Sequence, residues 1–231
     1  MDRTILFKAN RDFRRSDEPM RRTDYSFDAI MHYINECTSR IGNDIHIDAS
    51  KLEEKFFPTP HRMIFISHRS KNIKAAHEVK TLIETACPKF SCFIDSDVWA
   101  NIHYILTVLH SNYAHNNDGT YDYESCNKIT QNLCLILSMA LIKAIKDSIY
   151  FLYIPDGEER NLDIRSIVTA SPWVCQELLT ASLLQEPLKL LCENDGLIKN
   201  ASINLQFRYT ADSEHLHTSS LANFINYINR H

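Results

Sequence analysis

From residue 61 onward, the order of apolar and polar positions predicts strands that alternate with helices. Residues 63–67 (MIFIS) form a short apolar run, and residues 73–86 then repeat apolar side chains with a helical period. Residues 90–94 (FSCFI) form a second apolar run, and residues 148–154 (SIYFLYI) are the most strand-like stretch of the chain. The other predicted elements are helices at about 99–110, 129–146, 172–185 and 219–230 and a strand at 203–209.

This alternation predicts an α/β fold with an open, mainly parallel, doubly wound sheet. Strands that are joined through helices normally make right-handed crossovers within one sheet. Ligands of such folds lie beyond the carboxyl ends of the strands. The pattern therefore directs attention to residues 67–71, 95–99 and 155–173, which follow the predicted strands.

The first 60 residues have a different pattern. Residues 26–38 (SFDAIMHYINECT) carry apolar side chains at helical spacing, and residues 57–60 (Phe-Pro-Thr-Pro) cannot continue a helix. We therefore expect residues 1–60 to form a partly helical N-terminal extension. Residues 61–231 would form the α/β domain, with a Tyr-rich and Asn-rich insertion at about 98–128.

Composition narrows the possible functions. The net charge is −4, so no overall electrostatic attraction to nucleic acid is predicted, and we expect no nucleic-acid partner. The start of the chain is locally basic. Such a segment is either a solvated end of the chain or an arm that contacts RNA, an acidic partner or a membrane surface. Its basic residues are Arg3, Lys8, Arg11, Arg14, Arg15, Arg21 and Arg22.

Glycine and cysteine usage excludes several classes of site. The four glycines cannot build a G-x-G-x-x-G turn or a P-loop, so a bound nucleotide would be held without a Gly-rich phosphate cradle. The seven cysteines show no C-x-x-C spacing, and His215 and His217 lack a third ligand at metal spacing, so we expect no metal. No signal peptide and no apolar run of roughly 18 residues is apparent. These features predict a cytoplasmic protein that does not enter a membrane.

Several residues near the predicted strand ends could carry chemistry. His68 and Arg69 follow the first predicted strand, Asp95 ends the second, and Trp173 and Glu177 lie one turn apart in W-x-x-x-E. Each also has a purely structural interpretation. A helix often carries Glu and Trp at this spacing for packing and solubility, a loop histidine or arginine is commonplace, and an aspartate often caps a turn.

Three motifs in this order resemble those of the TIR (Toll/interleukin-1 receptor) domain family, especially its NAD-cleaving members. They are FISHRS after the first strand, CFID at the second, and SPWVCQELLTASL on a later helix. The resemblance covers about residues 61–185 and implies a flavodoxin-like fold. It also implies that Glu177 is the catalytic glutamate, that Trp173 lies at the nicotinamide side of the pocket, and that His68, Arg69 and Asp95 meet the substrate.

The implied activity is cleavage of the nicotinamide–ribose bond of NAD⁺, which is the substrate, with no further cofactor. The products would be nicotinamide and either ADP-ribose or a cyclic ADP-ribose-type signal. One carboxylate near the developing positive charge on the ribose would stabilise the transition state electrostatically. The soluble single-TIR chain resembles bacterial antiphage systems, which implies self-association through the TIR domain and a separate effector that responds to the product.

Two alternatives remain open on the sequence. The chain could be a non-catalytic TIR adaptor that acts through TIR–TIR assembly, although such adaptors often lack the glutamate. It could also be a nucleoside deoxyribosyltransferase-like enzyme, which uses a single Glu against a ribosyl centre. One departure from the family concerns the loop after the second strand, because no glycine follows until Gly119.

Overall fold

The chain forms two compact units that interleave along the sequence. The computed structural model describes residues 4–9, 26–42, 44–58, 64–154, 166–169, 171–184, 209–212 and 216–230. The first unit takes Met1–Asp17, His61–Ile94 and Ala144–His231, and the second takes Glu18–Pro60 and Asp95–Lys143.

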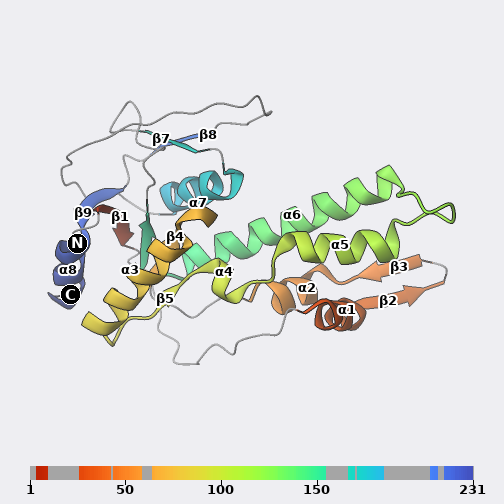
Figure 1. Cartoon of the computed structure of the whole chain (residues 1–231), viewed down its shortest axis with the longest axis horizontal. Helices are drawn as coiled ribbons and strands as arrows, with labels where there is room; N and C mark the ends of the chain where they lie inside the picture. Colours follow the sequence, from red (N-terminus) through yellow and green to blue (C-terminus); the bar gives the residue numbers. More distant parts are fainter. Residues whose placement is uncertain are drawn as a thin grey trace. The chain divides into compact units, whose positions relative to one another are not determined.

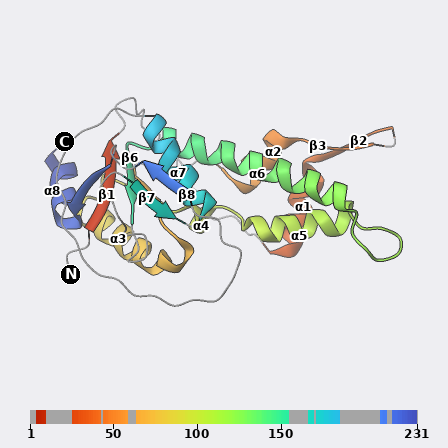
Figure 2. The same cartoon turned by 90° about the horizontal axis from the view of Figure 1, so that it is seen from above.

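The first unit is built on a five-stranded sheet with the order β5-β4-β6-β1-β9 (Figures 1 and 2). β4 pairs in parallel with both β5 and β6, whereas β1 pairs antiparallel with β6 and β9. The unit is therefore mixed α/β with a small parallel sheet of three strands, which two further strands extend. The strands are β1 (Thr4–Ala9), β4 (Ile64–Ser67), β5 (Cys92–Phe93), β6 (Tyr150–Tyr153) and β9 (His217–Ser220).

Helices lie on both sides of this sheet, and α3 and α7 are on opposite sides in both views (Figures 1 and 2). β7 and β8 pair antiparallel as a separate ribbon, and α7 packs beside this ribbon. The remaining elements of the unit are η1 (Ser70–Asn72), α3 (Ile73–Ala86), β7 (Ser166–Thr169), α7 (Pro172–Leu183), β8 (Tyr209–Asp212) and α8 (Leu221–Arg230).

Alternate residues of β4 face two different layers of the first unit. Ile64 and Ile66 join a buried apolar cluster to which α3 and α8 also contribute. Phe65 lies between them in sequence and stacks on Phe151 of β6, with ring centroids 5.7 Å apart. Because successive strand side chains point to opposite faces, Ser67 lies on the same face as Phe65. This face, opposite to α3 and α8, is the one that matters for the site.

The second unit is mainly helical and carries one β-hairpin. Its buried side chains include Ile34 of α1, Phe56 of α2 and Val108 of α5, and α1 packs against both α2 and α5. Its elements are α1 (Phe27–Glu36), β2 (Thr38–Ile41), β3 (Asp44–Ile47), α2 (Ala49–Phe56), α4 (Asp95–Val98), α5 (Ile102–Tyr113) and most of α6 (Tyr123–Lys146), whose last turn belongs to the first unit.

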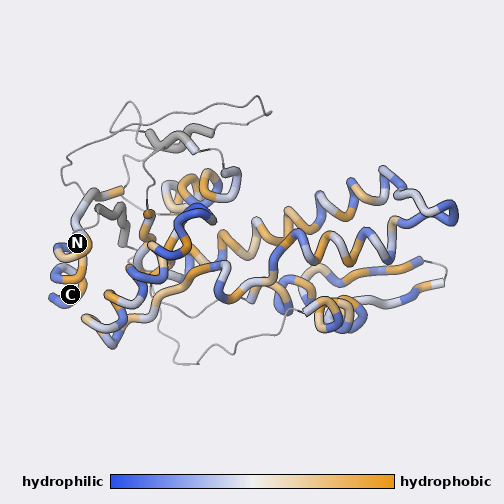
Figure 3. Tube along the Cα trace, viewed as in Figure 1, coloured by the Kyte–Doolittle hydropathy of each residue, from blue (hydrophilic) through white to orange (hydrophobic). Residues whose placement is uncertain are grey.

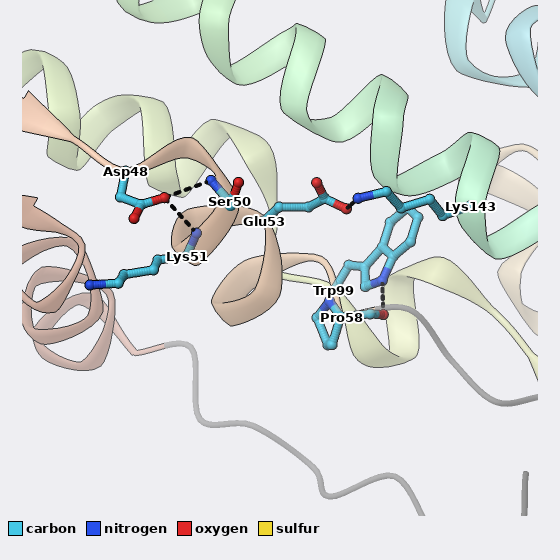
Figure 4. Close-up of polar contacts among 7 residues, drawn as sticks. All are labelled: Asp48, Ser50, Lys51, Glu53, Pro58, Trp99 and Lys143. Carbon is cyan, nitrogen blue, oxygen red and sulfur yellow. Dashed lines mark hydrogen bonds and ion pairs between the residues drawn. The ribbon is translucent and has the colours of Figure 1, made fainter.

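Capping side chains fix the starts of the first two helices in this unit. The Ser26 hydroxyl accepts a hydrogen bond from the backbone N–H of Ala29 at the start of α1. Asp48 Oδ1 accepts from the backbone N–H groups of Ser50 and Lys51 at 3.0 and 3.1 Å (Figure 4). Both caps satisfy N–H groups that have no partner within the helix.

Two further polar contacts connect α2 and the segment after it to the rest of the second unit (Figure 4). Lys143 Nζ of α6 lies 2.6 Å from Glu53 Oε1 of α2, and the Glu53 side chain is only 11% exposed. Trp99 Nε1 donates a hydrogen bond to the carbonyl of Pro58 at 3.0 Å. Residues before the predicted domain boundary and residues far beyond it therefore fold together.

This arrangement differs from the predicted division of the chain. β1 lies inside the first-unit sheet, although its residues fall within the predicted extension 1–60. Its six residues give little local signal, and its partners lie more than 140 positions away along the chain. The predicted insertion at 98–128 joins residues 18–60 in the second unit, because one-sided apolar helices such as 26–38 and 99–110 can bury their stripes against each other.

The predicted helices in the described residues are confirmed, and several strands were missed. Helices predicted at about 26–38, 73–86, 99–110, 129–146, 172–185 and 219–230 correspond to α1, α3, α5, α6, α7 and α8. The predicted strand at 203–209 falls outside the described residues except for Tyr209, the first residue of β8. The sequence did not predict β2, β3, β7 or β9, which are short and largely polar.

Helix α6 is long and apolar enough to cross a membrane when judged by length and composition alone, although no uninterrupted apolar run marks it in the sequence. Figure 3 shows apolar residues along much of this helix. A single helix of this kind is weak support for a membrane span, because core helices of soluble proteins have the same properties. Leu133, Leu137 and Ala140 of α6 are buried in the structure.

Candidate functional site

The start of α7 is fixed by a chain of short-range polar contacts. Thr169, the last residue of β7, is almost fully buried, and its hydroxyl oxygen accepts from the backbone N–H of Ser171 at 3.1 Å. The Ser171 hydroxyl in turn caps the helix by accepting from the backbone N–H of Val174 at 3.3 Å. Pro172 occupies the first helical turn, where its missing N–H costs nothing. These contacts fix the first residue of α7, and with it the position of Glu177 in the second turn of the helix.

Glu177 points into the interior of the first unit. The residue is 4% exposed and lies on the buried side of α7 together with Leu178 and Ala181. Burying a carboxylate is costly unless it is hydrogen-bonded or paired. At this position a leucine would serve packing better, so the presence of a glutamate calls for a partner.

One partner is the side chain of Ser67 at the end of β4. The Ser67 hydroxyl donates a hydrogen bond to Glu177 Oε2. Ser67 itself is 1% exposed. The contact joins residues 110 positions apart in sequence and connects α7 to the carboxyl end of the first parallel strand.

The location of this contact matches the place where open α/β sheets bind ligands. The chain passes from β4 to β5 on one side and returns to β6 on the other side of β4, so the order of the strands reverses at β4. Ser67 pairs with Tyr153 in register, and the backbone N–H of Ile154 donates to the carbonyl of Ser67 at 3.0 Å. The Glu177 carboxylate is therefore held at the carboxyl edge of two adjacent parallel strands.

His68 follows Ser67 directly and carries an unsatisfied buried atom. Its side chain is partly buried, and Nδ1 has no hydrogen-bond partner in the part of the chain that the structure describes. Buried polar atoms are nearly always hydrogen-bonded, so an atom of this kind needs an explanation, such as a ligand. Arg69 is also partly buried, and its carbonyl accepts from the backbone N–H of Asn72 at 2.7 Å, which closes the turn into η1.

The two other distinctive side chains of α7 differ in their exposure. Trp173 lies one turn before Glu177 and is partly exposed. Cys175 is buried, and burial raises the pKa of its thiol. A thiol with a raised pKa is poorly ionised at neutral pH and is a weak nucleophile. Cys175 is therefore a packing residue, and Glu177 is the candidate reactive group of this helix.

Asp95, the remaining predicted site residue, lies in the other unit. It begins α4 and belongs to the second unit, whereas His68, Arg69, Trp173 and Glu177 belong to the first. Its Oδ1 accepts a hydrogen bond from the backbone N–H of the next residue, Ser96, at 2.7 Å. We therefore build the site from the first unit without Asp95.

Ser67 lies within the FISHRS motif but was not among the predicted site residues. The available signal was a single polar residue closing the otherwise apolar run at 63–67. Its partner could not be identified, because nothing local connects residue 67 to residue 177. Among the described residues, no group of three or more His, Cys, Asp or Glu side chains is arranged to hold a metal ion.

No family model, curated protein or solved structure matches this chain. The resemblance to TIR domains therefore stays a hypothesis that rests on the three motifs in the sequence. The arrangement of Ser67, His68 and Glu177 is an independent basis for considering what the site can do.

Proposed function

We propose that the first unit cleaves the N-glycosidic bond between nicotinamide and ribose in NAD⁺, with Glu177 as the catalytic residue. The observation that carries this proposal is the buried Glu177 carboxylate, bound by Ser67 at the carboxyl edge of β4 and β6. A hydrogen-bonded carboxylate at such an edge is suited to stabilising a positively charged sugar. The unsatisfied Nδ1 of His68, one residue away from Ser67, further supports a ligand at this place.

The reaction needs little more than this carboxylate. Nicotinamide is cationic in NAD⁺ and leaves with the electron pair of the C1′–N bond as a neutral molecule. The ribose then carries positive charge shared between C1′ and its ring oxygen, which the negative charge of Glu177 stabilises. Water attacks C1′ and releases one proton to give ADP-ribose, or a nitrogen of the adenine attacks to give a cyclic product. Both outcomes balance without an oxidant or reductant.

The neighbouring side chains suit the rest of the substrate. The Arg69 guanidinium can bind phosphate oxygens in two-point geometry, and the His68 ring can bind a hydroxyl or a base through Nδ1. Trp173 offers an aromatic face on which the nicotinamide ring can stack. We further propose self-association of the chain, a separate effector that responds to a nucleotide product, and a role in antiphage defence, on the basis of the TIR-like motifs.

The test is nicotinamide release from NAD⁺ by concentrated protein, with products resolved by chromatography and mass spectrometry. Loss of a carboxylate that stabilises the transition state lowers kcat by about 10²-fold or more. We therefore expect Glu177→Ala and Glu177→Gln to release nicotinamide at least about 100 times more slowly than wild type. The control is Glu54→Gln, which removes an exposed carboxylate of α2 in the second unit and should leave the rate unchanged.

The other results distinguish the alternatives. Release of free base from deoxynucleosides but not from NAD⁺ would identify a deoxyribosyltransferase-like enzyme that uses the same carboxylate. No release from either substrate, together with full biological activity of Glu177→Ala, would identify a non-catalytic adaptor. Equal release by wild type and Glu177→Ala would remove Glu177 from the reaction.

A further inference from the structure

We infer that Ser67 is the positioning residue of this site, because its hydroxyl holds the Glu177 carboxylate in one orientation toward the reacting sugar. The inference rests on the proposed function and adds to it a residue that the sequence motifs did not assign. Ser67 acts through Glu177 and is not itself a catalytic residue.

Burying this pair is costly. Ser67 and Glu177 are 1% and 4% exposed. An alanine and a leucine at these positions would avoid the desolvation of a hydroxyl and a carboxylate. A fold usually departs from such local preference at a site where function requires it.

Ser67 stands on a rigid support, the strand β4. The backbone of Ser67 is held within β4, with Ile66 paired to Leu152 and Ser67 paired to Tyr153 in the parallel register. A serine has one rotatable side-chain bond, whereas a glutamate has three and loses much more freedom when it is ordered. A hydroxyl mounted on a strand therefore restricts a carboxylate on a helix more effectively than the carboxylate restricts itself.

A comparison with another buried serine shows that this contact is not a routine way to satisfy a hydroxyl. Ser148 is fully buried, and its hydroxyl donates to the carbonyl of Ala144, four residues earlier, at 2.8 Å. Such local bonds to the preceding turn are common for serine. Ser67 instead donates to a carboxylate that α7 brings from a distant part of the chain.

The kinetic test compares Ser67→Ala, Ser67→Thr and Ser148→Ala in nicotinamide release from NAD⁺. For Ser67→Ala we expect kcat to fall about tenfold, equivalent to about 1.4 kcal/mol, with little change in KM. Ser67→Thr keeps a hydroxyl and should recover most of kcat. Ser148→Ala should lower stability while leaving kcat and KM unchanged.

A stability measurement tests the same contact without relying on activity. The free energy of unfolding in urea is measured for Ser67→Ala, Glu177→Gln and the double variant. We expect the unfolding equilibrium constant of the double variant to differ about tenfold from the value that additive effects of the two changes would give. Additive effects would overturn the inference whether or not NAD⁺ is cleaved.

The two measurements separate the inference from the proposed function. If wild type releases nicotinamide and Ser67→Ala does so with unchanged kcat, the inference fails and the function stands. If wild type releases none, the function fails. In that case the double-mutant cycle still tests the contact. Coupled effects of Ser67→Ala and Glu177→Gln would mean that Ser67 orients Glu177 for another ligand, and additive effects would overturn the inference.

Discussion

Replacing Lys143 with methionine tests how far Glu53 depends on its ion pair in the second unit. The two charged atoms are 2.6 Å apart, and the side chains are 49% and 11% exposed, with Glu53 the buried partner. Methionine keeps most of the apolar stem of lysine and removes only the ammonium group. The Glu53 carboxylate, on a side chain that is 11% exposed, would then lose its cation.

The expected loss of stability follows from this unequal burial. A hydrogen bond to a charged group contributes about 1.5–3 kcal/mol, and removing one partner of a fully buried pair costs about 3–5 kcal/mol. Because Lys143 is half exposed, water can reach the carboxylate once the ammonium group is gone. We therefore expect Lys143→Met to lower the free energy of unfolding by about 2 kcal/mol. The double variant with Glu53→Met should recover much of this loss, since no unpaired charge remains.

The matched control is Lys55→Met, which breaks an equally short but exposed pair. Lys55 Nζ lies 2.7 Å from Glu36, and both side chains are 42% exposed. Water solvates the Glu36 carboxylate after the change, so the loss should be much smaller than for Lys143→Met. Urea unfolding followed by Trp99 fluorescence in a Trp173→Phe background reports on the second unit, because Trp99 is buried there. Equal losses for the two lysine variants, or additive effects of Lys143→Met and Glu53→Met, would refute the reasoning.

Two further predictions concern the first unit. Burial, with a contribution from Tyr227, raises the pKa of Tyr150 to about 12. The folded state therefore resists ionisation of this phenol. The neutral Tyr150 phenol therefore contributes its full stabilisation of the folded state below about pH 10, and this contribution is lost between about pH 10 and 12. Urea unfolding at increasing pH should show a smaller alkaline loss in Tyr150→Phe than in wild type, and equal losses would contradict the assignment. Leu6→Pro removes a backbone N–H from β1, which pairs on both sides. Thermal unfolding followed by circular dichroism should show a loss of about 1–3 kcal/mol or more, and an unchanged melting curve would argue against a central β1.

The sequence predicted those parts of the fold that depend on local periodicity. The helical period of residues 73–86 and the Ser-Pro start at 171–172 depend on neighbours within a few positions, and both are confirmed by α3 and α7. β1 could not be predicted in the same way, because its place depends on pairing with β6 and β9. The division into units was equally hidden, since α1 and α5 pack together across a long separation in sequence.

The candidate site shows the same limit at the level of single residues. Glu177 was identifiable because it stands in a local motif on one helix. Ser67 was visible only as a polar residue at the end of an apolar run, and its role depends on a contact that spans 110 positions.

The departure of the sheet from a doubly wound order does not remove the basis for the proposed reaction. β1 and β9 lie beyond β6, where such a sheet would continue with parallel strands, and β1 runs antiparallel to β6. The contact between Ser67 and Glu177 requires only β4, its neighbour β6 and the helix α7. The FISHRS motif begins in β4, and the SPWVCQELL motif lies on α7. Strands at the far edge of the sheet can therefore differ without changing the position of the carboxylate. Nicotinamide release from NAD⁺ by wild type and Glu177→Ala therefore tests the TIR-like interpretation more directly than the topology of the whole sheet does.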